Sequence, residues 1–200
     1  MSKDQERTGG FILVAAMAAV MWLVEVYDAV GGDPDSAGIR PRNPDGLVGV
    51  AASPFLHGSW GHLIGNTIPF LILGMIIAVG GLARVAAVTG IVALVGGLGT
   101  WLTAPSNTIV IGASGLIFGY ATYLLARGVY THRALHLVGG FVVLAVYGTT
   151  LLFSLVPTPG VSWQAHLFGG IGGVVAARVL HRGRDDVPAR GPARQATGLS

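Results

Sequence analysis

The stretch IGASGLIFGY, residues 111–120, places a serine between glycines inside an otherwise apolar run. Ser114 follows Gly112 and Ala113 and precedes Gly115. A lone serine in a membrane helix is usually a small packing residue, or it bonds back to its own backbone. The alternative is a nucleophile below the membrane surface. The residues elsewhere in the chain discriminate between these two interpretations.

The composition indicates a polytopic membrane protein. Of the 200 residues, 52% are hydrophobic and 10% are charged, and the mean hydropathy is +0.67. A soluble domain usually carries about 25% charged residues. Basic residues flank the apolar segments and form no continuous basic face, so no nucleic-acid partner is expected. The chain has no cysteine, which excludes disulfides, iron–sulfur clusters, thiolate catalysis and cysteine-based zinc sites.

Apolar stretches long enough to cross a bilayer, about 20 residues each, recur along the chain. The expected fold class is therefore an all-α polytopic membrane protein with six transmembrane helices. We expect an N-terminal tail at 1–10, a membrane domain at 11–181 and a disordered tail at 182–200. A long first loop occupies about 31–59, and a re-entrant loop precedes a short fourth helix. The six spans are expected at about 11–30, 60–80, 83–102, 113–128, 134–154 and 161–181.

The distribution of basic residues predicts the orientation in the membrane. Ten Lys and Arg residues fall on the side of the two termini, and only Arg40 and Arg42 fall on the other. Because basic loops stay in the cytoplasm, both termini are expected there. Arg outnumbers Lys eleven to one, and Ala, Gly and Val are abundant, which is typical of a bacterium with a GC-rich genome. The expected location is the plasma membrane.

Three polar clusters fall near the outer ends of spans two, four and six. The first is HGSWGHLIGN, in which His57 precedes the span and His62 and Asn66 share a helix face. The second is Ser114, and the third is His166 near the start of span six. Polar groups inside a membrane usually face the bundle interior and indicate function. Together these residues fit a serine–histidine pair better than three unrelated packing residues.

Glycine spacing favours contact between spans four and six. Gly115 begins a pair of glycines four residues apart, and Gly169 and Gly173 form a second such pair. Small residues at this spacing allow helix backbones to approach closely. Because His166 lies on the same face as Gly169 and Gly173, this packing would bring it to Ser114.

The chemistry that these residues permit is acyl transfer. His166 can take the proton of Ser114, which makes a dyad, because no acidic residue occurs between Asp45 and Asp185. The Ser114 backbone N–H at a helix N-terminus, with side-chain donors from His62 and Asn66, can stabilise the oxyanion.

Phe118 lies one turn after Ser114 on the same face. It can stack on the His166 ring and fix its orientation, although ordinary core packing is an equal alternative.

At these residues the sequence resembles the rhomboid family of intramembrane serine proteases. The resemblance rests on GASG at 112–115, on His166 followed by GGIGG, and on HGSWGHLIGN at 57–66, in this order within six spans. It covers about 55–180. It implies that Ser114 is the nucleophile and His166 the general base, with His62, Asn66 and the Ser114 backbone as the oxyanion site. Gly112 resembles the family glycine before the serine.

The resemblance also implies single-span membrane proteins as substrates, cut near the membrane surface, and no cofactor or metal. The sequence departs from the family in three places. Phe118 stands where many relatives have tyrosine, loop 1 lacks a Trp-Arg pair, and span three begins with GGLARV, without an acidic residue. The alternatives are an inactive relative that binds membrane clients and a small transporter. A transporter is disfavoured because no internal repeat is evident. The sequence does not predict an oligomeric state.

Overall fold

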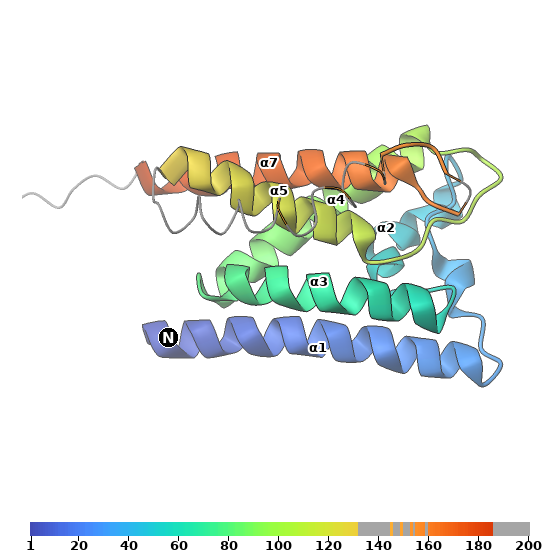
Figure 1. Cartoon of the computed structure of the whole chain (residues 1–200), viewed down its shortest axis with the longest axis horizontal. Coiled ribbons are helices and arrows are strands. Elements are labelled where there is room, and N and C mark those ends of the chain that lie inside the picture. Colours follow the sequence, from blue (N-terminus) through green and yellow to red (C-terminus); the bar gives the residue numbers. More distant parts are fainter. Residues whose placement is uncertain (132–144, 146–148, 150–152, 154, 159, 186–200) are drawn as a thin grey trace, which may run out of the picture.

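The computed structural model describes residues 1–131, 145, 149, 153, 155–158 and 160–185. The regular structure of these residues is helical, and they contain no β-strand (Figure 1). Two isolated β-bridges join loop segments. The helices, with 3-10 turns written η, are α1 (Lys3–Ala29), η1 (Pro34–Ala37), η2 (Pro44–Val48), α2 (Gly49–Ala52), η3 (Ser53–Phe55), α3 (Trp60–Ala78), α4 (Leu82–Thr103), α5 (Ser114–Thr131) and α7 (Trp163–Asp185).

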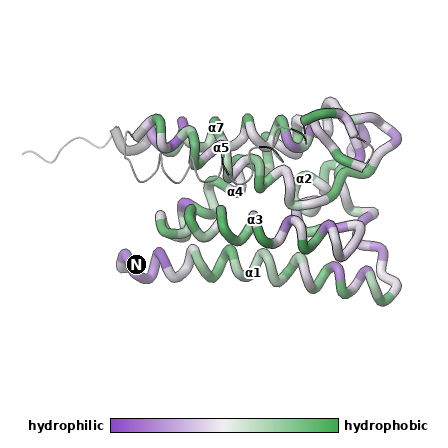
Figure 2. The backbone as a smooth tube through the Cα atoms, in the orientation of Figure 1, coloured by the Kyte–Doolittle hydropathy of each residue, from purple (hydrophilic) through white to green (hydrophobic). Residues whose placement is uncertain are grey.

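The helices α1, α3 and α4 are long and apolar enough to cross a membrane. Figure 2 shows their apolar middles, with more polar residues toward the ends. The helices α5 and α7 fall below that hydropathy, and both pack extensively inside the bundle, α5 on α7 and α7 also on α4. The described part of the chain is therefore a helical bundle in which three helices can cross a membrane.

The long helices form one bundle with a continuous apolar core. α1 packs on α3 and α4, and α3 packs on α5, which in turn packs on α7. Phe70 and Tyr120 stack in the core with ring centroids 5.7 Å apart, and both side chains are fully buried. The start of α1 and the end of α7 lie at the same end of the bundle, and loop 1 lies at the other (Figure 1).

The observed helices begin and end close to the expected spans, with two differences. α1 begins at Lys3, so the helix starts before the expected span and includes residues 3–10. A capping box explains this early start, because the Ser2 side chain accepts from the Gln5 backbone and the Gln5 side chain accepts from the Ser2 backbone. α7 continues to Asp185, four residues into the expected tail. The rest of that tail and most of the expected fifth span, 134–154, lie outside the described residues.

The N-terminus of α4 is capped by a carboxylate from another helix. Its own first turn has no acidic residue, as the sequence indicates. A Glu6 carboxylate oxygen from α1 lies 3.4 Å from the backbone nitrogen of Ala83 and accepts its hydrogen bond. A carboxylate at this position satisfies a free N–H and interacts favourably with the helix dipole.

Loop 1 is tied to the segment between α4 and α5. Ile39 and Val110 form an antiparallel bridge with backbone hydrogen bonds of 3.0 and 2.9 Å. Arg42 donates to the Leu102 carbonyl at 3.0 Å, and the Trp101 indole donates to the Asn43 carbonyl at 2.8 Å. These contacts satisfy the C-terminal end of α4 and hold the non-helical segment 104–113, which leads to Ser114, against loop 1.

Candidate active site

Ser114 is the first residue of α5 and is half-buried. Gly112, two residues earlier, has φ +112°, a conformation that glycine adopts and other residues rarely do. Its N–H donates to the Ser53 carbonyl of loop 1 at 2.8 Å. A Cβ at this position would lie 2.7 Å from His62 Nε2. Gly112 is therefore required both for the turn and for the close approach of His62.

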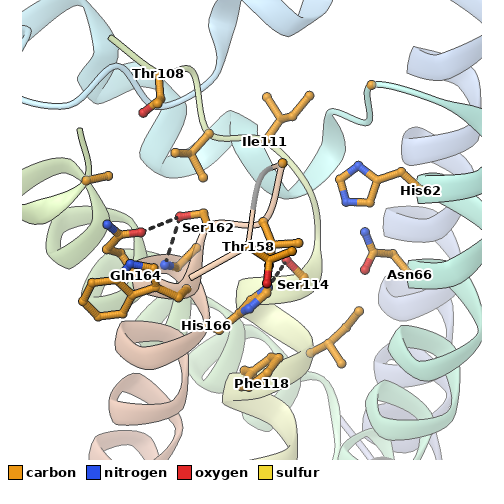
Figure 3. Close-up of a pocket in the computed structure, with 18 of the residues that line it drawn as sticks. His62, Asn66, Thr108, Ile111, Ser114, Phe118, Thr158, Ser162, Gln164 and His166 are labelled. Atoms are coloured by element: carbon orange, nitrogen blue, oxygen red, sulfur yellow. Dashed lines mark hydrogen bonds between the residues drawn. The ribbon is translucent and has the colours of Figure 1, made fainter. Parts of the chain in front are cut away.

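His166 lies in the first turn of α7, and its side chain is buried. Ser162 precedes the helix, and its hydroxyl accepts from the backbone N–H of Ala165 at 3.3 Å. His166 Nε2 lies 2.8 Å from Ser114 Oγ (Figure 3). The two atoms are within hydrogen-bond distance, so a proton can pass between the serine oxygen and the imidazole nitrogen.

Close packing of α5 on α7 creates this contact. A Cβ at Gly169 would overlap the Gly115 carbonyl oxygen, and one at Gly173 would overlap the Gly119 carbonyl oxygen. Thr122 of α5 donates to the Gly170 carbonyl of α7 at 2.7 Å. The glycine faces that the spacing predicts are thus in backbone contact.

We expect Gly169→Ala to lower activity at least about 100-fold, because the added methyl forces α5 and α7 apart and a shift of about 1 Å in the reacting groups has an effect of this size. Unfolding should also occur at lower temperature, since overpacking costs about 1–3 kcal/mol. The matched control is Gly170→Ala, whose Cβ would lie 3.5 Å from Thr122 Cγ2, an ordinary contact. Equal effects of the two variants in cleavage and unfolding assays would contradict this account.

Phe118 stacks on His166. The ring centroids are 4.4 Å apart and the planes are inclined by 5°. Phe118 is buried on α5 one turn below Ser114, which is where the sequence places it. A parallel stack of this kind restricts rotation of the imidazole.

His62 and Asn66 extend from α3 toward the space facing Ser114 (Figure 3). Asn66 is 7% exposed, and its amide nitrogen has no hydrogen-bond partner among the described residues. The α3 helix is capped by Ser59, whose hydroxyl accepts from the His62 backbone N–H at 3.2 Å. Burying an amide donor without a protein partner is costly, which makes this nitrogen a candidate donor to water or to a bound molecule.

His57 lies just before α3, 1% exposed, with its ring 5.0 Å from that of His62 in an edge-to-face arrangement. Burial lowers the pKa of His57 to about 4, and the neighbouring His62 contributes in the same direction. The Phe55 backbone opposes the shift, but neither ring nitrogen of His57 has a well-formed hydrogen bond in the described structure. His57 is therefore neutral near pH 7.

We expect the protein to lose stability as the pH falls from about 6.5 toward 4. The folded-state pKa of His57 lies below the ordinary value of 6.5, so the unfolded chain binds the extra proton in this window and acid favours unfolding. The loss should be on the order of 3 kcal/mol at pH 4. Unfolding midpoints measured against pH should fall less steeply for His57→Phe. An identical slope for the two proteins would contradict the assignment to His57.

A cavity of about 1150 Å³ opens beside the serine. Its wall on α3 includes His62, Gly65, Asn66 and Pro69, and its opposite wall includes His166. No Asp or Glu is among the described residues that line it, which fits a pair without a third, acidic member. In the described part of the chain, no group of three or more His, Cys, Asp or Glu side chains is placed to hold a metal ion.

The structure adds residues that the sequence analysis does not single out. Thr108, Ser162 and Gln164 place polar groups at the cavity, and the Ser53 carbonyl orients Gly112. The stretch SWQAH, which precedes the glycines of α7, already contains Ser162 and Gln164 as polar residues. Nothing in the sequence distinguishes the Ser53 carbonyl, because a backbone contact across 59 residues leaves no local pattern.

Comparison with known proteins matches the rhomboid domain to residues 44–183. An uncharacterized protein of Mycobacterium tuberculosis is 44% identical over 180 residues, which cover 86% of this chain and 75% of that protein. An uncharacterized protein of Mycobacterium leprae is 41% identical over 181 residues, 86% of this chain and 71% of the relative. A Bacillus subtilis protein named "Putative rhomboid protease YdcA" is 28% identical over 165 residues, 80% and 82% of the two chains.

The helical bundle, with helices long and apolar enough to span a membrane and a cavity within it, is the architecture of an integral membrane protein. The chain belongs to the rhomboid family, whose domain covers residues 44–183. Members of this family are generally serine proteases that act on membrane proteins.

Proposed function

We propose that this protein is an intramembrane serine protease that hydrolyses peptide bonds in transmembrane segments of other membrane proteins. The observation that carries the proposal is the hydrogen bond of 2.8 Å between His166 Nε2 and Ser114 Oγ at the wall of a large cavity. Membership of the rhomboid family supports the same activity.

In the proposed reaction, Ser114 Oγ attacks the carbonyl carbon of the scissile bond while His166 Nε2 takes its proton. The carbonyl electron pair moves to the oxygen, and its return breaks the C–N bond. The amine leaves with the proton from His166, and an acyl-enzyme ester remains on Ser114. A water molecule then attacks the ester with His166 again as base, releasing the acid and restoring the serine.

The oxyanion site in this proposal consists of the Ser114 backbone N–H with His62 and Asn66. The Ser114 N–H lies at the start of α5, where the helix dipole favours negative charge. The amide nitrogen of Asn66 has no partner in the described structure and faces the cavity, so it is available as a donor. Gly112 leaves room for the His62 ring next to the serine loop.

The proposed topology has six spans, a re-entrant segment before α5, both termini in the cytoplasm, and the cavity open to the outer side of a bacterial plasma membrane. It is supported by the basic-residue asymmetry and by the common end of α1 and α7 in the bundle (Figure 1). Substrates are expected to be single-span membrane proteins.

The test is covalent labelling of the detergent-solubilised protein with a fluorophosphonate, which reacts with activated serines, followed by peptide mapping. We expect the label on Ser114, together with cleavage of a single-span reporter reconstituted in liposomes. A folded protein that neither takes the label nor cleaves any reporter would contradict the proposal. It would favour a rhomboid relative that binds membrane clients without cutting them.

Asn66→Ala should lower kcat by about 10²–10³, the usual value of one oxyanion donor, because His62 and the Ser114 backbone remain. KM should change little, since the donor acts on charge that develops only in the transition state. The matched control is Thr67→Ala, the next residue, which does not line the cavity and whose hydroxyl donates to the Leu63 carbonyl and accepts from the Trp22 indole. Full activity of Asn66→Ala would assign the oxyanion role to the other two donors.

A further inference from the structure

The helix α3 contains a proline in its interior, Pro69. Proline has no backbone N–H, so the carbonyl of Gly65, four residues earlier, lacks its regular helical partner. Among the described residues, no backbone N–H outside α3 donates a hydrogen bond to this carbonyl. The proline also pushes the carbonyl outward, because its ring occupies the space that the carbonyl would point into.

The two residues between which the helical hydrogen bond is missing, Gly65 and Pro69, both border the cavity. Gly65 and Pro69 line its wall on the face of α3 that also carries Asn66. Gly65 is exposed, and nothing described lies within 4 Å of a Cβ built on it. With no side chain to cover it, the carbonyl is an accessible acceptor one turn deeper than His62.

The same stretch of α3 borders the surface that faces lipid in a bilayer. Ile68 and Ile72 lie one and two turns after Gly65 on nearly the same side of the helix, and they are 57% and 47% exposed. An apolar segment that moves from lipid into the cavity along α3 therefore passes the Gly65 carbonyl before it reaches Ser114. A segment that unwinds there exposes N–H groups, which need acceptors in an apolar environment.

We infer that the Gly65 carbonyl, freed by Pro69, is a binding subsite that accepts a hydrogen bond from a backbone N–H of the unwinding substrate segment. The inference rests on the proposed function and names a contact of the same cavity. The subsite binds the substrate backbone, so it does not select a particular side chain.

The first test restores the missing helical hydrogen bond. Pro69→Ala supplies an N–H to the Gly65 carbonyl. Because proline is unfavourable in a helix interior, the variant protein should be at least as stable to unfolding as the wild type. KM for a transmembrane reporter should rise about 3- to 10-fold, the factor that one hydrogen bond is worth. The rates of fluorophosphonate labelling and kcat should stay unchanged.

Two further variants control this result. Gly61→Ala improves the helix propensity of α3 at an exposed position outside the cavity, and it should leave KM unchanged. Gly65→Ala places a methyl group beside the carbonyl, and it should raise KM as Pro69→Ala does. If Pro69→Ala lowers labelling as much as cleavage, the effect lies in the oxyanion residues and the inference is wrong.

The second test removes the donor from the substrate. Reporter peptides in which one peptide bond at a time is replaced by an ester lack a single N–H. One position should raise KM about 3- to 10-fold with the wild-type enzyme and have no effect with Pro69→Ala. A carbonyl that holds only water would show no such position and would overturn the inference.

An unlabelled wild type would instead refute the proposed protease, whereas a labelled wild type with an unaffected Pro69→Ala variant refutes the subsite alone.

Discussion

Ser114→Ala is expected to abolish cleavage of a transmembrane reporter and all fluorophosphonate labelling, while the protein stays folded. The Ser114 hydroxyl lies 2.8 Å from His166 Nε2, the proposed base, so its loss removes the proposed nucleophile. Deleting one oxygen from a half-buried side chain leaves almost no cavity. The lost hydrogen bond costs only about 1 kcal/mol of stability. Substrate should therefore still bind, and it should copurify with the variant.

Cleavage should be followed on gels after reconstitution in liposomes, and folding by thermal unfolding in detergent. The control is Ser36→Ala in loop 1, whose hydroxyl donates to the Asp33 carbonyl and lies in no wall of the cavity. That variant should cleave at the wild-type rate. Turnover by Ser114→Ala comparable to wild type would mean that the nucleophile is elsewhere.

His166→Ala should lower kcat by on the order of 10³ or more, because a serine hydroxyl is a poor nucleophile without a base. Some activity above background should remain, since the oxyanion donors and substrate binding are retained. The matched control is His181→Ala on the same helix, where the ring stacks on Tyr130 at 5.8 Å near the other end of α7. Single-turnover rates separate this chemical defect from any change in binding.

The double variant Ser114→Ala with His166→Ala should be no less active than Ser114→Ala alone, because the two residues act as one unit. A His166→Ala enzyme with more than a tenth of wild-type activity would exclude His166 as the general base. The stack of Phe118 on His166 would then be ordinary core packing.

The pairing of Ser114 with His166 was predictable from the sequence because membrane helices restrict the possibilities. With six spans predicted, spans two, four and six are expected to run in one direction, which places His62, Ser114 and His166 near the same ends of these spans and at one expected depth. The glycine pairs then identify the faces of spans four and six that pack closely, and the structure has this packing at Gly169. The role of each residue in catalysis stays a prediction until it is measured.

The contacts of loop 1 could not be predicted from the sequence. The bridge between Ile39 and Val110, and the hydrogen bond from Gly112 N–H to the Ser53 carbonyl, join segments more than fifty residues apart. Both are backbone contacts, which any residue except proline can make, so no side-chain pattern indicates them. Ser2 and Gln5 form a capping-box pattern that indicates the early start of α1. The expected start of the first span was instead placed where the apolar stretch begins.

By itself, the sequence determined the membrane class, the helical architecture and the candidate reactive residues. The length of the apolar stretches, the bias of basic residues and the glycine spacing are local properties that can be read along the chain. Only the tertiary structure decided that His166 Nε2 meets Ser114 Oγ, that Phe118 lies flat on the imidazole, and that Gly112 makes room for His62. Differences of about 1 Å separate a reactive pair from an unreactive one, and such differences depend on how whole helices pack.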